Sequence, residues 1–280
     1  MYSLDNTVKQ LEEKIKEDDF VVADSCFFFP RIFMLDEESK GLIEHVESLE
    51  RRKRKNITKI RDLENSLKDS LINKKELEKG ILFLEEYGKV IDFLKGNEKI
   101  YITYNVKEEL EEGISRIKKG EKRAKNRNFS NKEREYWPKN AKSERKKGIA
   151  FRKWESRKLR DSLAEMNRRI IDLSFNKEYP LISSYVPDGF SSTDKDIVAV
   201  TFYKGIVEQE KYKKCKILSF DFKHVYPLFK ETYENLLDYS NKNDNELSKK
   251  IKSAKIELTS IKSDGKLTLE KAPFHLFNEQ

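Results

Sequence analysis

The chain has 280 residues, of which 39% are charged and only 37% are hydrophobic, so we expect a small core under a large solvated surface. Two cysteines and three scattered histidines exclude a disulfide framework and a four-cysteine zinc site, and they argue against a histidine-rich metal site. No run of residues is apolar for long enough to span a membrane, and no apolar signal core follows the first residues. We therefore expect a soluble, cytoplasmic protein with no membrane partner.

The first predicted elements are a buried strand and a long helical arm. Residues 20–29 (FVVADSCFFF) are β-branched and aromatic and are bounded by charges and by Pro30, a pattern typical of a short buried strand. From residue 39 to residue 95, apolar residues recur at alternating steps of three and four, which predicts a helical hairpin of coiled-coil character. We expect this arm to be the surface for a second copy of the chain or for a protein partner.

Strands and helices alternate along the rest of the chain. Two further strands and one capped, buried helix are expected at residues 99–104, 214–220 and 193–209. A helix opens near Val106, and another carries an apolar stripe that includes Met166 and Ile170. Residues 256–271 alternate around Asp264 and the glycine after it, which predicts a β-hairpin.

Strands separated by helices predict an α/β fold with a mainly parallel central sheet flanked by helices. We expect a discontinuous catalytic core made of residues 1–38, 96–112 and 176–240. Two insertions interrupt this core, the helical hairpin at 39–95 and a basic helical segment at 113–175. Residues 241–280 are expected to form a C-terminal extension that contains the β-hairpin.

Positive charge is concentrated in the basic segment. Residues 113–160 contain 19 Lys and Arg against 5 Glu, whereas the remaining 232 residues sum to a net charge of −6. Aromatic residues are interleaved with these charges, and a nucleic-acid groove uses cations for phosphates and aromatic faces for unstacked bases. The contacts to nucleic acid are expected from Lys122, Arg123, Arg127, Trp137, Arg145, Lys146, Lys147, Arg152, Lys153, Trp154 and Arg157. The alternative is a solvated helix whose aromatic residues pack on the body of the protein.

Acidic residues gather where α/β proteins place their sites, at the carboxyl ends of the strands. The expected site contains Asp24, Glu109, Asp194, Asp196 and Asp221. Carboxylates brought together repel one another unless cations neutralise them, and hard oxygen ligands suit Mg²⁺ or Mn²⁺. Such an ion can activate a water molecule for in-line attack on a phosphodiester. Taken singly, a strand-end aspartate is also an ordinary turn residue, and Asp194 is also a helix cap.

These acids fall in a four-part pattern that resembles the PIN-domain ribonucleases. The parts are Asp24-Ser25-Cys26 at the first strand, Val106-x-x-Glu109-Leu110 after the second, Asp194 with Ile197, Ala199 and Thr201 in a helix, and Ser219-x-Asp221 at the last core strand. The resemblance implies that Asp24, Glu109, Asp194 and Asp221 bind one or two divalent ions. It also implies that these four acids cleave RNA endonucleolytically. It implies an extra ligand in Asp196 and supporting hydroxyl groups in Ser25 and Ser219.

We therefore expect a metal-dependent endoribonuclease that grips RNA through its basic segment. Two alternatives remain open. One is a structure-specific DNA nuclease of the flap-cleaving kind, which would use the same acidic chemistry, and the other is a non-catalytic RNA-binding protein that keeps the fold. Cys26 and Cys215 are expected to be core residues, because both lie in apolar strand contexts.

Overall fold

The computed structural model describes the backbone of residues 19–28, 91–94, 96–126, 141–219, 222–261 and 267–271, together with residues 13, 15 and 89. Within these ranges, the side chains of residues 123–126, 141–152, 154, 222–223, 260–261 and 267–271 are outside the description. The helical hairpin expected at 39–95 lies outside the described residues except near its end, so it stays a prediction.

The chain divides into two compact units. The first unit comprises Met1–Phe28, Lys89–Leu110 and Ser162–Gln280, and the second comprises Phe29–Gly88 and Glu111–Asp161. The second unit therefore takes in most of both segments that the sequence marks as insertions. The first unit holds the sheet and all the residues of the site described below.

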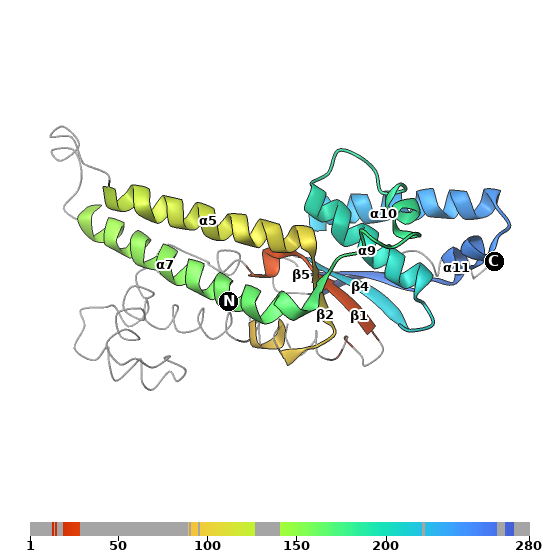
Figure 1. Ribbon diagram of the computed structural model, residues 1–280, viewed down its shortest axis with the longest axis horizontal. Helices are drawn as coiled ribbons and strands as arrows, with labels where there is room; N and C mark the ends of the chain where they lie inside the picture. The colour runs from red at the N-terminus through yellow and green to blue at the C-terminus, as the bar shows by residue number, and fades with distance from the viewer. Residues whose placement is uncertain are drawn as a thin grey trace. The chain divides into compact units, whose positions relative to one another are not determined.

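The first unit is built on a sheet whose strands follow the order β3-β2-β1-β4-β5-β6. Figure 1 labels β1, β2, β4 and β5 of this sheet. The strands are β1 (Asp19–Ala23), β2 (Ile100–Thr103), β3 (Ile170–Ile171), β4 (Lys214–Ser219), β5 (Ile256–Ile261) and β6 (Leu267–Lys271). The first five are parallel to their neighbours, and β6 runs antiparallel to β5. The expected α/β class is thus confirmed.

Strand β1 lies in the middle of the sheet, and all five of its residues are buried. A strand covered on both faces reads as a continuous apolar run, which is how the Phe20–Ala23 stretch appears in the sequence. The three predicted strands correspond to β1, β2 and β4. The predicted hairpin is present as β5 and β6, but β5 also pairs with β4, so this hairpin extends the central sheet.

One predicted helix is shorter than expected. Helix α7 (Ala141–Met166) ends before Ile170, which the apolar stripe had assigned to the same helix. Ile170 and Ile171 instead form β3, where they pair with Ile102 and Thr103 of β2. The prediction was wrong here because a two-residue strand is too short to show a period of its own, and its isoleucines continue the helical spacing by coincidence.

Helix α9 (Ser192–Val207) packs against the sheet, and other helices lie around it (Figure 1). Its close approach depends on Gly205, because a Cβ at this position would lie 2.6 Å from Cγ1 of Ile256 in β5. The neighbours of α9 are α8 (Tyr179–Ser183), α10 (Phe222–Lys242) and α11 (Glu246–Ser253). No helix in the described ranges is long and apolar enough to cross a membrane.

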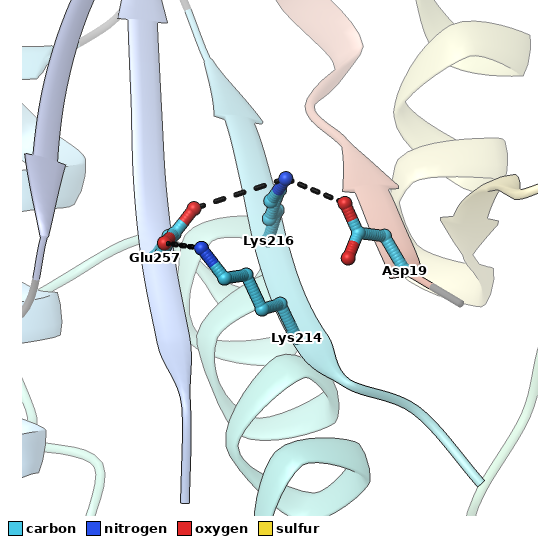
Figure 2. Close-up of polar contacts among 4 residues, drawn as sticks. All are labelled: Asp19, Lys214, Lys216 and Glu257. Atoms are coloured by element: carbon cyan, nitrogen blue, oxygen red, sulfur yellow. Dashed lines mark hydrogen bonds and ion pairs between the residues drawn. The ribbon is translucent and has the colours of Figure 1, made fainter. Parts of the chain in front are cut away.

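A chain of buried charges crosses three strands near their amino ends (Figure 2). Lys216 of β4 places its Nζ 2.6 Å from Oδ2 of Asp19 in β1 and 3.8 Å from Oε2 of Glu257 in β5. Lys214 Nζ lies 2.7 Å from the other oxygen of Glu257. The Lys216 and Asp19 side chains are only 4% and 2% exposed, so each charge depends on its partners for the solvation that water would otherwise provide.

Candidate active site

The site lies where the strand order of the sheet reverses. From β1 the chain continues to β2 and β3 on one side, and then returns to place β4 and β5 on the other side. In open α/β sheets the crevice at such a reversal, outside the carboxyl ends of the two strands, is the usual binding position. Asp24 directly follows β1, and Ser219 is the last residue of β4, so both stand at this position.

The carboxylate of Asp24 is held by two donors. Its Oδ2 accepts a hydrogen bond from Ser219 Oγ at 2.6 Å and another from the Cys26 thiol at 2.9 Å. The backbone continues the sheet at this point, because the Asp24 amide donates to the carbonyl of Leu218 at 2.9 Å. The side chain is only 4% exposed, and its position is therefore set by both central strands.

Glu109 reaches the same place from helix α5 (Tyr104–Asn126). This helix begins immediately after β2, where the Thr103 hydroxyl accepts a hydrogen bond from the Val106 amide at 3.3 Å and so caps its first turn. Glu109 is half-buried on the second turn. The helix thus directs an acid from the end of one strand toward the ends of its neighbours.

Burial and neighbouring charges raise the pKa of Glu109. Loss of solvation is the largest cause, and the nearby carboxylates of Asp24 and Asp194 add to it, while hydrogen bonds with the Thr193 and Ser25 side chains oppose it. Asp24, which follows β1, and Asp194 of α9 therefore both lie close enough to Glu109 of α5 to repel its charge. Such mutual repulsion is the property that the sequence predicted for this site.

Asp194 combines its place in the site with a capping role. Its amide donates to Ser191 Oγ at 3.0 Å, and the Ser191 hydroxyl donates to Asp194 Oδ2 at 2.7 Å. The N-cap of α9 is therefore Ser191. Asn105 of α5 also reaches this helix start, donating to the carbonyl of Ser192 at 3.5 Å. The entry to α9 is thus fixed beside the start of α5.

Asp196 faces a different partner. The Tyr179 hydroxyl donates to Asp196 Oδ1 at 2.8 Å, which ties α8 to α9. Burial, together with the Asp196 carboxylate, raises the pKa of Tyr179 and keeps it protonated as the donor. Asp196 is not among the groups that shift the pKa of Glu109. The structure therefore brings together Asp24, Glu109 and Asp194, and gives Asp196 a structural contact.

Asp221, the fourth acid of the pattern, lies outside the described residues, so its part in the site stays a prediction. Of the two hydroxyl groups expected to support the site, Ser219 donates to Asp24 and the Ser25 side chain hydrogen-bonds to Glu109, while their role in a metal site stays a prediction. Sequence reasoning assigned no role here to Thr193, which bonds to Glu109, or to Cys26, which it placed in the core. The available signal was a small polar residue one or two positions from each acid.

The acids offer oxygen donors, the ligand type that Mg²⁺ and Mn²⁺ prefer. Within the ranges that the structure describes, no group of three or more His, Cys, Asp or Glu side chains is spaced to hold a metal ion. The chemistry of the donors thus fits a hard cation, while the described side chains alone do not form a ready coordination shell.

Few of the side chains expected to contact nucleic acid are described. Lys122 of α5 is exposed, and Lys153 and Arg157 of α7 are half-buried. The side chains of the other predicted contacts are outside the description: Arg123, Arg127, Trp137, Arg145, Lys146, Lys147, Arg152 and Trp154. The nucleic-acid surface of the basic segment therefore stays a prediction.

Comparison with known proteins does not identify a family for this chain. No protein-family model, curated protein or solved structure matches the chain. The functional assignment accordingly depends on the arrangement of Asp24, Glu109 and Asp194 at the reversal of the strand order.

Proposed function

We propose that the protein is a metal-dependent endoribonuclease that hydrolyses RNA phosphodiester bonds at the acidic site. The observation that carries this proposal is the approach of Asp24 and Asp194 to Glu109 beside the carboxyl end of β1, where burial and, after it, the charges of these two acids raise the pKa of Glu109. Three acids brought together, Asp24 buried and Glu109 and Asp194 half-buried, are costly for a protein that only has to fold. A cation bound at the site would offset this cost.

The residues that would hold the ion are Asp24, Glu109, Asp194 and Asp221. A bound Mg²⁺ or Mn²⁺ would supply an activated water molecule and would stabilise the charge that develops on the phosphate. The carboxylates would in turn be relieved of their mutual repulsion, since each gains a positive neighbour. The chain itself contributes the fixed positions of these groups.

The residues around the acids hold them in place. Ser219 and Cys26 orient Asp24, and the Thr193 and Ser25 side chains hydrogen-bond to Glu109. Because its pKa is raised, Glu109 keeps a proton to higher pH than an ordinary glutamate does. A bound cation would displace this proton, because the form of Glu109 that can serve as a ligand is the carboxylate.

RNA is the preferred substrate because of the resemblance to PIN-domain ribonucleases, and the basic segment supports a nucleic acid in general. A net charge of +14 over residues 113–160 would neutralise several phosphates. The metal chemistry itself acts on the phosphate and does not distinguish RNA from DNA. The test below therefore compares RNA with DNA as the substrate.

The test is a cleavage assay on end-labelled RNA and DNA, including single strands, hairpins and flaps, with Mg²⁺, Mn²⁺ or EDTA. We expect internal cleavage of RNA that EDTA abolishes and that Asp24→Asn lowers at least a hundredfold. Asp238→Asn is the matched control, because Asp238 is an exposed aspartate on α10 and is not one of the acids of the site. No cleavage of any substrate by the wild-type protein would overturn the proposal, and cleavage of flaps alone would establish the DNA alternative.

A further inference from the structure

Cys26 makes an unusual contact for a residue in an apolar stretch. Its Sγ donates to Asp24 Oδ2 at 2.9 Å and lies 3.8 Å from Ser219 Oγ, which donates to the same oxygen at 2.6 Å. Cys26 belongs to the short 3-10 helix η1 (Ser25–Phe28), whereas Ser219 ends β4, 195 residues after Asp24. Oδ2 of Asp24 therefore accepts hydrogen bonds from one donor that is close in sequence and from one that is distant in sequence.

We propose that Cys26 is a positioning residue for the acidic site: with Ser219 it engages Oδ2 of Asp24, so that Oδ1 is the oxygen presented to a cation. This inference rests on the proposed function. None of the hydrogen bonds that the described residues make to Asp24 ends on Oδ1, and both that involve its carboxylate end on Oδ2. The two oxygens, which are equivalent in a free carboxylate, are thereby made different.

Two donors are needed because the carboxylate group of an aspartate rotates easily. Rotation about its Cβ–Cγ bond is broad and roughly two-fold, so one hydrogen bond leaves the carboxylate plane free to swing. Repulsion from Glu109 would turn the plane away from the site. Two donors bonded to the same Oδ2 oppose this rotation. The groups that orient a metal ligand in this way typically change metal affinity or activity by about 10–100-fold when they are removed.

The geometry also distinguishes this role from packing. A cysteine that only fills space would be replaced by alanine at a cost in stability, whereas a donor would be replaced by serine with its hydrogen bond retained. Cys215 offers the comparison within the same chain. It is fully buried in β4, and its Cβ would contact a methyl group placed on Gly205, so it is a packing residue.

The experiment uses the full chain and measures Mn²⁺ binding by the electron paramagnetic resonance signal of the free ion, alongside single-turnover cleavage of RNA. Cys26→Ala should weaken Mn²⁺ binding by about 10–100-fold and slow cleavage by a similar factor. Cys26→Ser should restore both to within about threefold of wild type, because it keeps a donor. Cys215→Ala should lower the melting temperature and leave Mn²⁺ affinity unchanged. Circular dichroism checks that each variant is folded.

A second measurement tests whether the two donors act on one atom. Because both donors are needed to fix the carboxylate plane, Cys26→Ala and Ser219→Ala should each remove most of the effect, so the double variant should lose less Mn²⁺ affinity than the product of the single losses. Losses that simply multiply would overturn the joint action of the two donors on Oδ2, as would a Cys26→Ala protein that binds Mn²⁺ like wild type. If the wild-type protein cleaves RNA but Cys26→Ala has no effect, only the positioning role fails. If the wild-type protein neither binds Mn²⁺ nor cleaves, the proposed function fails and this inference fails with it.

Discussion

Glu109 shows how a single side chain can report on the whole site. Its carboxylate has lost part of its water, the Thr193 and Ser25 side chains hydrogen-bond to it, and the charges of two other acids act on it. Loss of solvation and like charge favour its protonated form, while the hydroxyl groups favour its ionised form. Since the first two effects dominate, Glu109 costs the folded protein free energy once it is ionised.

This cost makes stability depend on pH in a direction that can be stated. The pKa of Glu109 is higher in the folded protein than the ordinary value of about 4.3, so the folded state binds more protons between these two values. The free energy of unfolding therefore falls as pH rises through that interval. Glu109→Gln should remove this loss, so that its advantage over wild type grows from about pH 4 to a plateau near neutral pH. Urea unfolding in EDTA at several pH values measures it, and parallel curves for the two proteins would contradict it.

Asp24→Asn makes a separate prediction about stability in the absence of metal. Asparagine keeps an oxygen that can accept from Ser219 and Cys26, while it removes one charge from the repulsive cluster. We therefore expect the melting temperature in EDTA to stay level or to rise by a few degrees, although cleavage is abolished. Differential scanning fluorimetry measures the shift. A clear fall in melting temperature would instead assign Asp24 a structural role.

At the scale of elements, the buried charges of Asp19, Lys216 and Glu257 link three parallel strands. In the sheet register Asp19 pairs with Lys214, and Lys216 pairs with Glu257. A slip of one strand by one residue would move a charge to the opposite face of the sheet, away from its partners. The ion pairs thus favour one register of β1, β4 and β5, and this register is what sets Ser219 beside Asp24.

The two lysines of this cluster provide a matched pair of variants. Lys216→Met should lower the free energy of unfolding by about 3–5 kcal/mol, because it takes a buried ammonium group away from a buried carboxylate. Lys214→Met should cost no more than about 1 kcal/mol, because the Lys214 side chain is 40% exposed and water already weakens its ion pair. Urea denaturation measures both values. Equal losses for the two variants would show that burial does not govern this cluster.

The elements also show what the sequence could and could not predict. Strands β1, β2 and β4 were predictable because their apolar runs end at a charge or a turn, and Asp24 and Glu109 were found by their places next to such runs. Strand β3 was not predictable, because it is only two residues long and its pairing with β2 depends on tertiary contacts that no sequence pattern indicates. The Cys26 hydrogen bond was also hidden, since the shared acceptor becomes visible only when β4 brings Ser219 next to β1.

For the whole molecule, the separation of charge defines how a nucleic acid would be bound. The segment at 113–160 carries a net charge of +14 and the other 232 residues sum to −6, so phosphates should be attracted to the basic segment and repelled by an acidic site without cations. Binding and cleavage are then assigned to different parts of the chain. Metal ions should matter for cleavage far more than for binding.

Neutralising part of the basic segment tests this assignment. Replacing Arg145, Lys146 and Lys147 by Gln should weaken RNA binding and reduce the slope of log affinity against log salt by up to about three, one for each phosphate that is no longer neutralised. Fluorescence anisotropy with the Asp24→Asn protein measures binding without cleavage. An unchanged affinity and slope would mean that these residues form a solvated helix or a protein-binding surface, and would favour an RNA site elsewhere on the chain.

The strand order also governs when the site comes into existence during synthesis. Strand β1 is made early, but Ser219, which closes the site on β4, follows Asp24 by 195 residues. At roughly 5–20 residues per second, translation needs about 10–40 s to cover that distance. During this time β1 lacks its neighbour β4 on one side. The chain between β1 and β4 is long, and closing so long a loop slows folding. A nascent chain therefore lacks the Ser219 contact to Asp24 until most of the protein up to β4 has been made.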